Sequence, residues 1–141
     1  MVLNIMIKNE CLFCKIQEEN YSKEIIFQSD YFYVTRDSYP VTKLHTLIIS
    51  NRHVPTFFEL DDIEVLDLSN ILKKQKIDIR NLDDTVTAFN IGINDGKDAG
   101  QSINHLHVHL IPRRVGDIDN PQGGVRGVIP NKQKYIRRKT L

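Results

Sequence analysis

The sequence predicts an α+β fold, with a mostly antiparallel five-stranded sheet, one long helix and a short N-terminal helix. Three observations support this prediction. Short stretches rich in β-branched and aromatic residues alternate with turn residues, which is typical of strands. One longer stretch has a helix start signal followed by helical apolar spacing. The chain has 141 residues, enough for a single domain with one core.

The strands are expected at residues 25–27, 31–35, 45–49, 85–93 and 105–111. The first two form a hairpin whose turn lies near Ser29 and Asp30. Pro40 lies beyond the second strand, since proline cannot donate to a strand ladder. A turn at 94–96 ends the fourth strand.

The long helix is expected to begin at Asp61 and to run to about Gln75. Asp61 has the N-cap position, and Glu64 lies three residues later, where it can reach back as in a capping box. The apolar face of this helix is predicted from the spacing of Ile63, Leu66, Ile71 and Leu72. A short helix is expected from Cys11 to Asn20.

Composition excludes several function classes. The net charge is +1 and charged residues make up 26% of the chain, so no strong field would recruit nucleic acid or a membrane surface. Residues 1–7 lack the charged region and cleavage site of a secretory signal, and no apolar run is long enough to span a membrane. A cytoplasmic location is the default expectation. The chain is expected to be one domain, 1–141, in which 113–141 form a largely irregular tail.

Three of the five histidines occur at consecutive alternate positions, His105, His107 and His109. Alternate side chains of a strand share a face, so the three imidazoles are expected to point one way and the apolar residues between them the other. Alternate positions lie ~6.6 Å apart, about two strand rises, so the rings would line one groove without direct contact. A half-buried strand whose polar face happens to carry histidine is the alternative.

The stretch 105–111 has the pattern His-φ-His-φ-His-φ-φ, in which φ is apolar. It resembles the signature of the histidine-triad superfamily of nucleotide hydrolases and transferases. Residues 94–102 resemble the same family, because they match its Asn-x-Gly-x-x-x-Gly-Gln-Ser loop before the triad. The likeness extends from Cys11 to Arg126.

A third segment, from Asp37 to His45 with Pro40 inside it, resembles the family pattern Asp-x-x-Pro-x-x-x-Gly-His. Leu44 departs from this pattern, since the family usually has glycine there. Glycine is often used where the backbone must approach closely or adopt an unusual conformation. A side chain at this position could therefore narrow the ribose pocket or shift the local backbone.

The resemblance implies a homodimeric enzyme that acts at the α-phosphate of a nucleoside phosphoanhydride or phosphoramidate, such as diadenosine tetraphosphate. A neutral imidazole is a competent nucleophile toward phosphorus, and a nucleotidyl-histidine intermediate would split the reaction into two easier steps. His107 matches the family's nucleophile. His109 and His45 would complete the phosphate environment, and Ser102 could donate to the leaving oxygen.

The resemblance also implies a substrate-binding set. Asp37 matches the family residue that holds the ribose hydroxyls. Asn94 and Gln101 match residues that bind the substrate phosphates, together with His109. The glycine-rich loop between Asn94 and Ser102 could itself cradle an anion through its backbone amides.

Cys11 and Cys14 have the spacing with which two thiolates bind one ion, but a single Cys-x-x-Cys is only half of a zinc site. A redox dithiol and two inert thiols are the alternatives. Zinc-carrying bacterial members of the family use two N-terminal cysteines, a histidine after the third strand and the first triad histidine. These match Cys11, Cys14, His53 and His105, so the resemblance implies a closed, structural zinc site.

Two other function classes stay open. In one, the three triad histidines jointly hold a catalytic metal ion in a hydrolase or lyase. A cupin-type site of this kind would need a downstream carboxylate, and no glutamate follows Glu64. In the other, the protein is a nucleotide-binding adaptor with little turnover, against which an intact triad argues only weakly.

Overall fold

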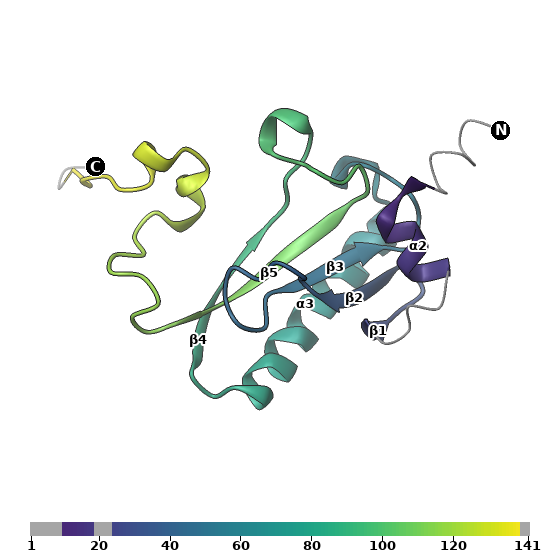
Figure 1. Cartoon of the computed structure of the whole chain (residues 1–141), viewed down its shortest axis with the longest axis horizontal. Coiled ribbons are helices and arrows are strands. Elements are labelled where there is room, and N and C mark those ends of the chain that lie inside the picture. The colour runs from purple at the N-terminus through teal and green to yellow at the C-terminus, as the bar shows by residue number, and fades with distance from the viewer. Residues whose placement is uncertain (1–9, 19–23, 139–141) are drawn as a thin grey trace.

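The computed structural model describes residues 10–18 and 24–138. Its centre is one antiparallel sheet with the strand order β1-β2-β3-β5-β4 (Figure 1). The elements are α2 (Leu12–Glu18), β1 (Ile25–Gln28), β2 (Phe32–Arg36), β3 (Thr46–Ser50), α3 (Asp62–Leu82), β4 (Val86–Gly92) and β5 (His107–Arg114). The predicted fold class is confirmed, and so is the pairing of the first two strands as a hairpin.

The two faces of the sheet are covered by different helices. Side chains of Phe32, Val34, Ile48 and Val108 form one core cluster with residues of α3. On the opposite face, Tyr33, Leu47 and Ile49 form a second cluster with α2. This division follows from strand alternation, because neighbouring residues of β2 and β3 point to opposite faces. The short helix α2 has seven residues and covers only one end of the face that it occupies (Figure 1).

The long helix α3 begins where predicted, and the prediction of its buried face was right for Ile71 and wrong for Ile63 and Leu66. Ile63 and Leu66 are 55% and 62% exposed, whereas Glu64 is only 2% exposed. Glu64 tolerates burial because its carboxylate accepts hydrogen bonds from Arg52 Nη2 (2.7 Å) and from the backbone N–H of Asp61 (3.0 Å). The Arg52 hydrogen bond is also the main cause that lowers the pKa of Glu64.

α3 also extends seven residues beyond the predicted end at Gln75. Its buried positions are Glu64, Leu68, Ile71, Gln75 and Ile79. Two of these five are polar, so the apolar period in the sequence stops before the helix does.

β5 begins two residues later than predicted, at His107. The backbone of Leu106 pairs with the loop after β3: its N–H donates to Val54 (2.7 Å) and its carbonyl accepts from Ser50 (3.2 Å). His105 lies in an irregular segment that precedes the pairing of β5 with β3, which begins at His107.

Beyond β5, described residues 115–138 contain two short 3-10 helices, η3 (Gly124–Val128) and η4 (Pro130–Lys132). Within the described ranges, no helix combines the length and the apolarity that crossing a membrane would require.

Candidate active site and metal centre

The register between β3 and β5 places the histidines. Leu47 pairs with His109 and Ile49 with His107, and His45 directly precedes β3. Val108 and Leu110 face the side of α3, so His107 and His109 project from the opposite face of the sheet. The structure thus brings His45, from one end of β3, beside the triad of the next strand.

Four metal-ligating side chains meet where α2, the loop after β3 and the start of the triad come together: Cys11, Cys14, His53 and His105. Their sulfur and nitrogen atoms all lie within 4.8 Å of one another. Cys11 Sγ is 3.3 Å from His105 Nδ1, and Cys14 Sγ is 3.2 Å from His53 Nδ1. In a tetrahedral zinc site, neighbouring nitrogen and sulfur ligands would lie about 3.3–3.8 Å apart. The cluster is close to that geometry.

A hydrogen bond outside this cluster directs the lone pair of His105 into it. His105 Nε2 lies 2.7 Å from the carbonyl oxygen of Ser50. A carbonyl can only accept, so Nε2 carries the hydrogen and Nδ1 is left to bind a metal. Burial is the main cause that lowers the pKa of His105 to about 4, which keeps the ring neutral. Both cysteines are buried and lie outside any disulfide, so the residues present fit a metal ion.

His107 is held in one tautomer by the backbone beside it. Its Nδ1 lies 2.8 Å from the carbonyl oxygen of His105 and therefore donates its hydrogen there. Nε2 is left with a lone pair, which is the form that a nucleophile needs. The residue is 8% exposed, so access to it is narrow.

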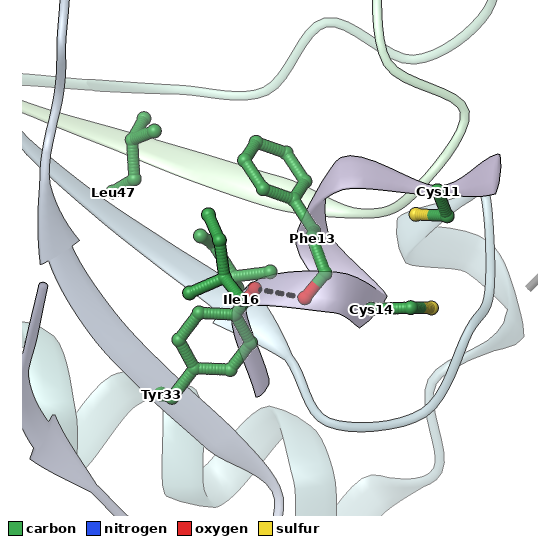
Figure 2. Packing of buried hydrophobic residues seen from close by; sticks show 7 residues of the cluster. Cys11, Phe13, Cys14, Ile16, Tyr33 and Leu47 are labelled. Carbon is green, nitrogen blue, oxygen red and sulfur yellow. Dashed lines mark hydrogen bonds between the residues drawn. The ribbon is translucent and has the colours of Figure 1, made fainter. Parts of the chain in front are cut away.

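Phe13 links the metal cluster to His107 and was not singled out in the sequence. Its ring centroid lies 5.0 Å from that of His107 and 5.8 Å from that of His105, with edge-on geometry in both cases. Tyr33 fixes the backbone of Phe13, because its hydroxyl donates to the Phe13 carbonyl over 2.6 Å (Figure 2). Phe13 lies between the two cysteines in sequence, and this position is the feature of the sequence that could have predicted its place beside the histidines.

A chain of hydrogen bonds runs through His45 to His109. The backbone N–H of Val41 donates to His45 Nδ1 over 3.0 Å, so the hydrogen of neutral His45 is on Nε2. His45 Nε2 lies 2.9 Å from His109 Nδ1 and donates to it. His109 is thereby left with its own hydrogen on Nε2. Asp37 lies beside this chain, with its Oδ2 3.5 Å from His45 Nε2 and 3.9 Å from His109 Nδ1.

Burial keeps the imidazoles of His45 and His109 neutral. It is the main cause that lowers the pKa of His109 to about 4, and the nearby rings of His107 and His45 lower it further. Burial also lowers the pKa of His45, and the charge of Asp37 opposes it. At pH 7, His109 therefore presents an N–H donor.

Leu44 has a φ of 71°, and it is the one non-glycine residue with positive φ in the part of the chain that the structure describes. His45 N–H donates to the carbonyl of Thr42 over 3.1 Å, which places Leu44 third in a tight turn. Type II turns favour glycine at that position. The side chain of Leu44 packs against a small core cluster that includes Leu110. The turn before His45 thus keeps the backbone that glycine would favour.

The loop before the triad contributes three predicted residues in different ways. Gln101 uses its amide to hold the loop, since it accepts from Gly96 N–H (2.8 Å) and donates to the carbonyl of Pro55 (2.8 Å). Asn94 and His109 both belong to the lining of one cavity. Ser102 is exposed. Within the described ranges, neither Asn94 nor Ser102 hydrogen-bonds to a histidine.

The metal-centred alternative finds no geometric support. Among the residues that the structure describes, two groups have three or more ligand atoms within 4.8 Å of one another, and neither contains all three triad histidines. His105 belongs to the cysteine cluster, His109 belongs to the group with Asp37 and His45, and His107 belongs to neither.

This fold, with His107 and His109 on β5 and His105 just before it, is that of a histidine-triad domain. The family model described as the HIT domain matches residues 17–116, and the chain belongs to the HIT family.

Among its relatives, a HIT-like protein of Methanocaldococcus jannaschii is 33% identical over 107 residues, which are 76% of this chain and 81% of that protein. An asymmetrical bis(5'-nucleosyl)-tetraphosphatase of Schizosaccharomyces pombe is 41% identical over 78 residues. That match covers 55% of this chain and only 42% of the yeast protein.

Among solved structures, the chain is similar to a zinc-bound histidine triad family protein from Mycobacterium smegmatis. The two have 30% sequence identity and a TM-score of 0.70, with 78% of this chain and 79% of the other covered.

Proposed function

We propose that this protein is a nucleotide hydrolase or transferase that acts at the α-phosphate of a nucleoside phosphoanhydride or phosphoramidate. The observation that carries the proposal is the tautomer of His107, whose Nδ1–H donates to the His105 carbonyl so that Nε2 has a free lone pair. Membership of the HIT family supports it, as does the similarity to a bis(5'-nucleosyl)-tetraphosphatase.

In the proposed reaction, His107 Nε2 forms a bond to the α-phosphorus as the bond from phosphorus to the leaving atom breaks. The leaving atom keeps the electron pair of that bond. A leaving amine also takes up one proton from solvent. Water then hydrolyses the nucleotidyl-histidine, returns one proton to solvent and regenerates neutral His107, so the two steps balance.

His109 is proposed to stabilise the phosphoryl oxygens or the leaving atom through its Nε2–H. His45 is proposed to orient His109, since it donates to His109 Nδ1. Asp37 is proposed to accept from the ribose hydroxyls, and Asn94 to contact the phosphates. For Ser102 we propose donation to the leaving oxygen. Gln101 is proposed to act through the loop backbone that its amide holds.

We further propose that the ion held by Cys11, Cys14, His53 and His105 is zinc, with a structural role. Two thiolates and two imidazoles form a donor set that suits zinc, and the similar Mycobacterium smegmatis protein is zinc-bound. Bound there, the metal would hold α2 and the loop after β3 against the start of the triad.

The experiment that tests the function is turnover of adenosine phosphoramidate and diadenosine tetraphosphate by wild type and by His107→Ala. The variant should lose several orders of magnitude, beyond the roughly 10²–10⁴ of a general acid–base. Asn104→Ala, an exposed neighbour in the same segment, is the matched control. Labelled adenylate should be trapped on His107 of the wild type. More than about a tenth of normal activity in His107→Ala would refute the nucleophile, and a wild type that binds nucleotide without turnover would favour the adaptor.

A homodimer is also proposed on the family resemblance, and a cytoplasmic location on the two closely spaced cysteines. Ile63, Leu66 and Ile77 are exposed on α3 at spacings that place them near one face, and β4 is an edge strand of the sheet. Sedimentation of wild type and Leu66→Glu would test the dimer, since a buried charge at this face should favour monomers.

A further inference from the structure

The turn before His45 lies along β5, beyond the end of the ladder that β5 forms with β3. β5 pairs with β4 as far as Arg114, but its pairing with β3 ends at Leu110. Residues 42–45, which we call the His45 turn, bond to β5 beyond Leu110. His109 belongs to β5, so a bond from the His45 turn to this strand fixes the turn relative to His109.

Two hydrogen bonds attach the His45 turn to β5. Thr42 Oγ1 donates to the carbonyl oxygen of Pro112 over 2.6 Å. Arg114 Nη2 donates to the carbonyl oxygen of Lys43 over 2.9 Å. Lys43 is exposed and Thr42 is only partly buried, so this surface turn depends on such bonds more than a buried turn would. The two bonds therefore hold the turn against the strand that carries the triad.

The end of α3 fixes the guanidinium of Arg114. Asp83, which follows α3, accepts hydrogen bonds on its Oδ2 from Arg114 Nη2 (3.0 Å) and Nε (3.3 Å). The other carboxylate oxygen of Asp83, Oδ1, accepts from the backbone N–H of Thr85 over 3.0 Å, so the carboxylate is held on both sides. Only 18% and 13% of the Arg114 and Asp83 side chains are exposed. Arg114 Nη2 is thus directed at the Lys43 carbonyl from a fixed position.

Val41, which directly precedes the His45 turn, sets the tautomer of His45. We call Val41 N–H, His45 and His109 the relay, because the Val41 bond to His45 Nδ1 leaves the His45 hydrogen on Nε2 to be donated to His109. Asp37 Oδ2, at 3.5 Å from His45 Nε2, is a weak acceptor at that distance. If water replaces the Val41 bond, His45 can carry its hydrogen on Nδ1 instead. His45 Nε2 then accepts from His109 Nδ1, and His109 Nε2 loses its hydrogen.

We propose that Arg114 and Thr42 are positioning residues for His109. They hold the His45 turn against β5 and so keep the N–H of Val41 on His45 Nδ1. The relay then keeps a hydrogen on His109 Nε2. The inference rests on the proposed function, in which that N–H stabilises the phosphoryl oxygens or the leaving atom. It deepens the proposed function, since it assigns a role in the reaction to two residues outside the triad.

Amide hydrogen exchange tests the Val41 hydrogen bond directly, without any substrate. Arg114→Met and Thr42→Val each remove one bond to β5 and keep most of the side-chain bulk. Exchange at Val41 should become about fivefold to tenfold faster in each variant, as expected for the loss of one hydrogen bond. Thr42→Ser keeps the hydroxyl and should keep the protection of Val41. Arg80→Met is the matched control, because it removes an exposed bond to the Thr87 carbonyl (3.1 Å) and should leave exchange at Val41 as in wild type.

Nitrogen NMR of the imidazoles and steady-state kinetics test the consequence for the reaction. A ring nitrogen that carries a hydrogen and one that has a lone pair differ widely in chemical shift, so the spectra of His45 and His109 give their tautomers. Wild type should have Nε2–H on both, and in Arg114→Met the two nitrogen shifts of each ring should move toward each other. With adenosine phosphoramidate, kcat should fall about fivefold and KM should stay within about twofold, since the lost N–H acts in the transition state. Arg80→Met should keep the wild-type kcat.

The outcomes separate this inference from the function on which it rests. Exchange at Val41 that Arg114→Met and Thr42→Val leave unchanged, or that Arg80→Met accelerates equally, would overturn the positioning role while the hydrolase stands. So would a normal kcat in Arg114→Met. A wild type with the expected exchange and tautomers that cleaves no adenylate in a His107-dependent way would refute the proposed function and, with it, any role of the two residues in turnover.

Discussion

Two groups of side chains in this protein combine metal-binding residue types with metal-binding distances, and they differ in where their hydrogens lie. One contains Cys11, Cys14, His53 and His105, and the other contains Asp37, His45 and His109. In the first group, the Ser50 carbonyl accepts a hydrogen bond from His105 Nε2–H, so the lone pair of His105 Nδ1 faces the cysteines. In the second group, the N–H of Val41 donates to His45 Nδ1, so the hydrogen of His45 is on Nε2 and faces His109.

The difference shows that a backbone group outside a cluster decides what the cluster can do. A backbone acceptor behind an imidazole makes the imidazole a ligand, and a backbone donor behind it makes the imidazole a donor. The same residue type therefore offers a metal-binding lone pair in one place and a hydrogen-bond donor in the other.

The largest expected effect is on the metal. Purified protein should contain one zinc per chain and not two, measured by mass spectrometry of the native protein or by elemental analysis. Cys14→Ser should abolish that zinc and lower the free energy of unfolding by about 4 kcal/mol or more, because metal binding energy is folding energy. Leu12→Ser, at an exposed neighbour, is the control. Two zinc ions per chain, one of them lost in His45→Ala, would mean that the relay is a ligand set as well.

The second largest effect is expected from acid, which should destabilise the folded protein through His109. The pKa of His109 is about 4 in the folded state and about 6.5 when unfolded, so the unfolded state binds more protons between these values. The free energy of unfolding is therefore highest above pH 6.5, where His109 is neutral in both states, and it falls as the pH drops through 4. His109→Gln should remove about 3 kcal/mol of this dependence, measured by denaturant unfolding between pH 6.5 and 4. Identical pH dependence in wild type and variant would contradict a neutral, buried His109.

Asp37 can separate ribose binding from a role in the relay. If it accepts from the ribose hydroxyls, Asp37→Ala should weaken binding of ribonucleotides about tenfold or more relative to their dideoxy analogues. Isothermal titration with both sugars measures this. Equal losses for both sugars would instead mean that Asp37 acts through His45, whose Nε2 lies 3.5 Å from its carboxylate.

The smallest effect concerns the turn that delivers His45. At an ordinary helix or strand position alanine is more stable than glycine, but Leu44 has a φ of 71°. Leu44→Gly should therefore be more stable than Leu44→Ala by about 1 kcal/mol, since a Cβ is disfavoured in this conformation. Chemical denaturation of the two variants measures the difference. The opposite order would show that packing of the side chain outweighs backbone conformation here.

Patterns of local periodicity were enough to predict the fold class and the hairpin, and the family resemblance implied which cysteines and histidines would meet. They failed where tertiary contacts decide. Burial of Glu64 depends in part on Arg52, which reaches it from the loop after β3. The groups that set the tautomers, Val41 N–H and the Ser50 carbonyl, belong to the backbone, which is the same for every residue type. No side-chain pattern could therefore identify them.

The long sequence separations within both groups have a consequence for folding kinetics. Cys11 and His105 are 94 positions apart, and His45 and His109 are 64 apart. Closing a loop of 94 residues costs entropy that only the docked contacts repay, so we expect the contact between Cys11 and His105 to form late in folding. A metal ion bound across such a contact acts on the native side of the folding barrier. We expect it to lengthen the lifetime of the folded protein without hastening its formation.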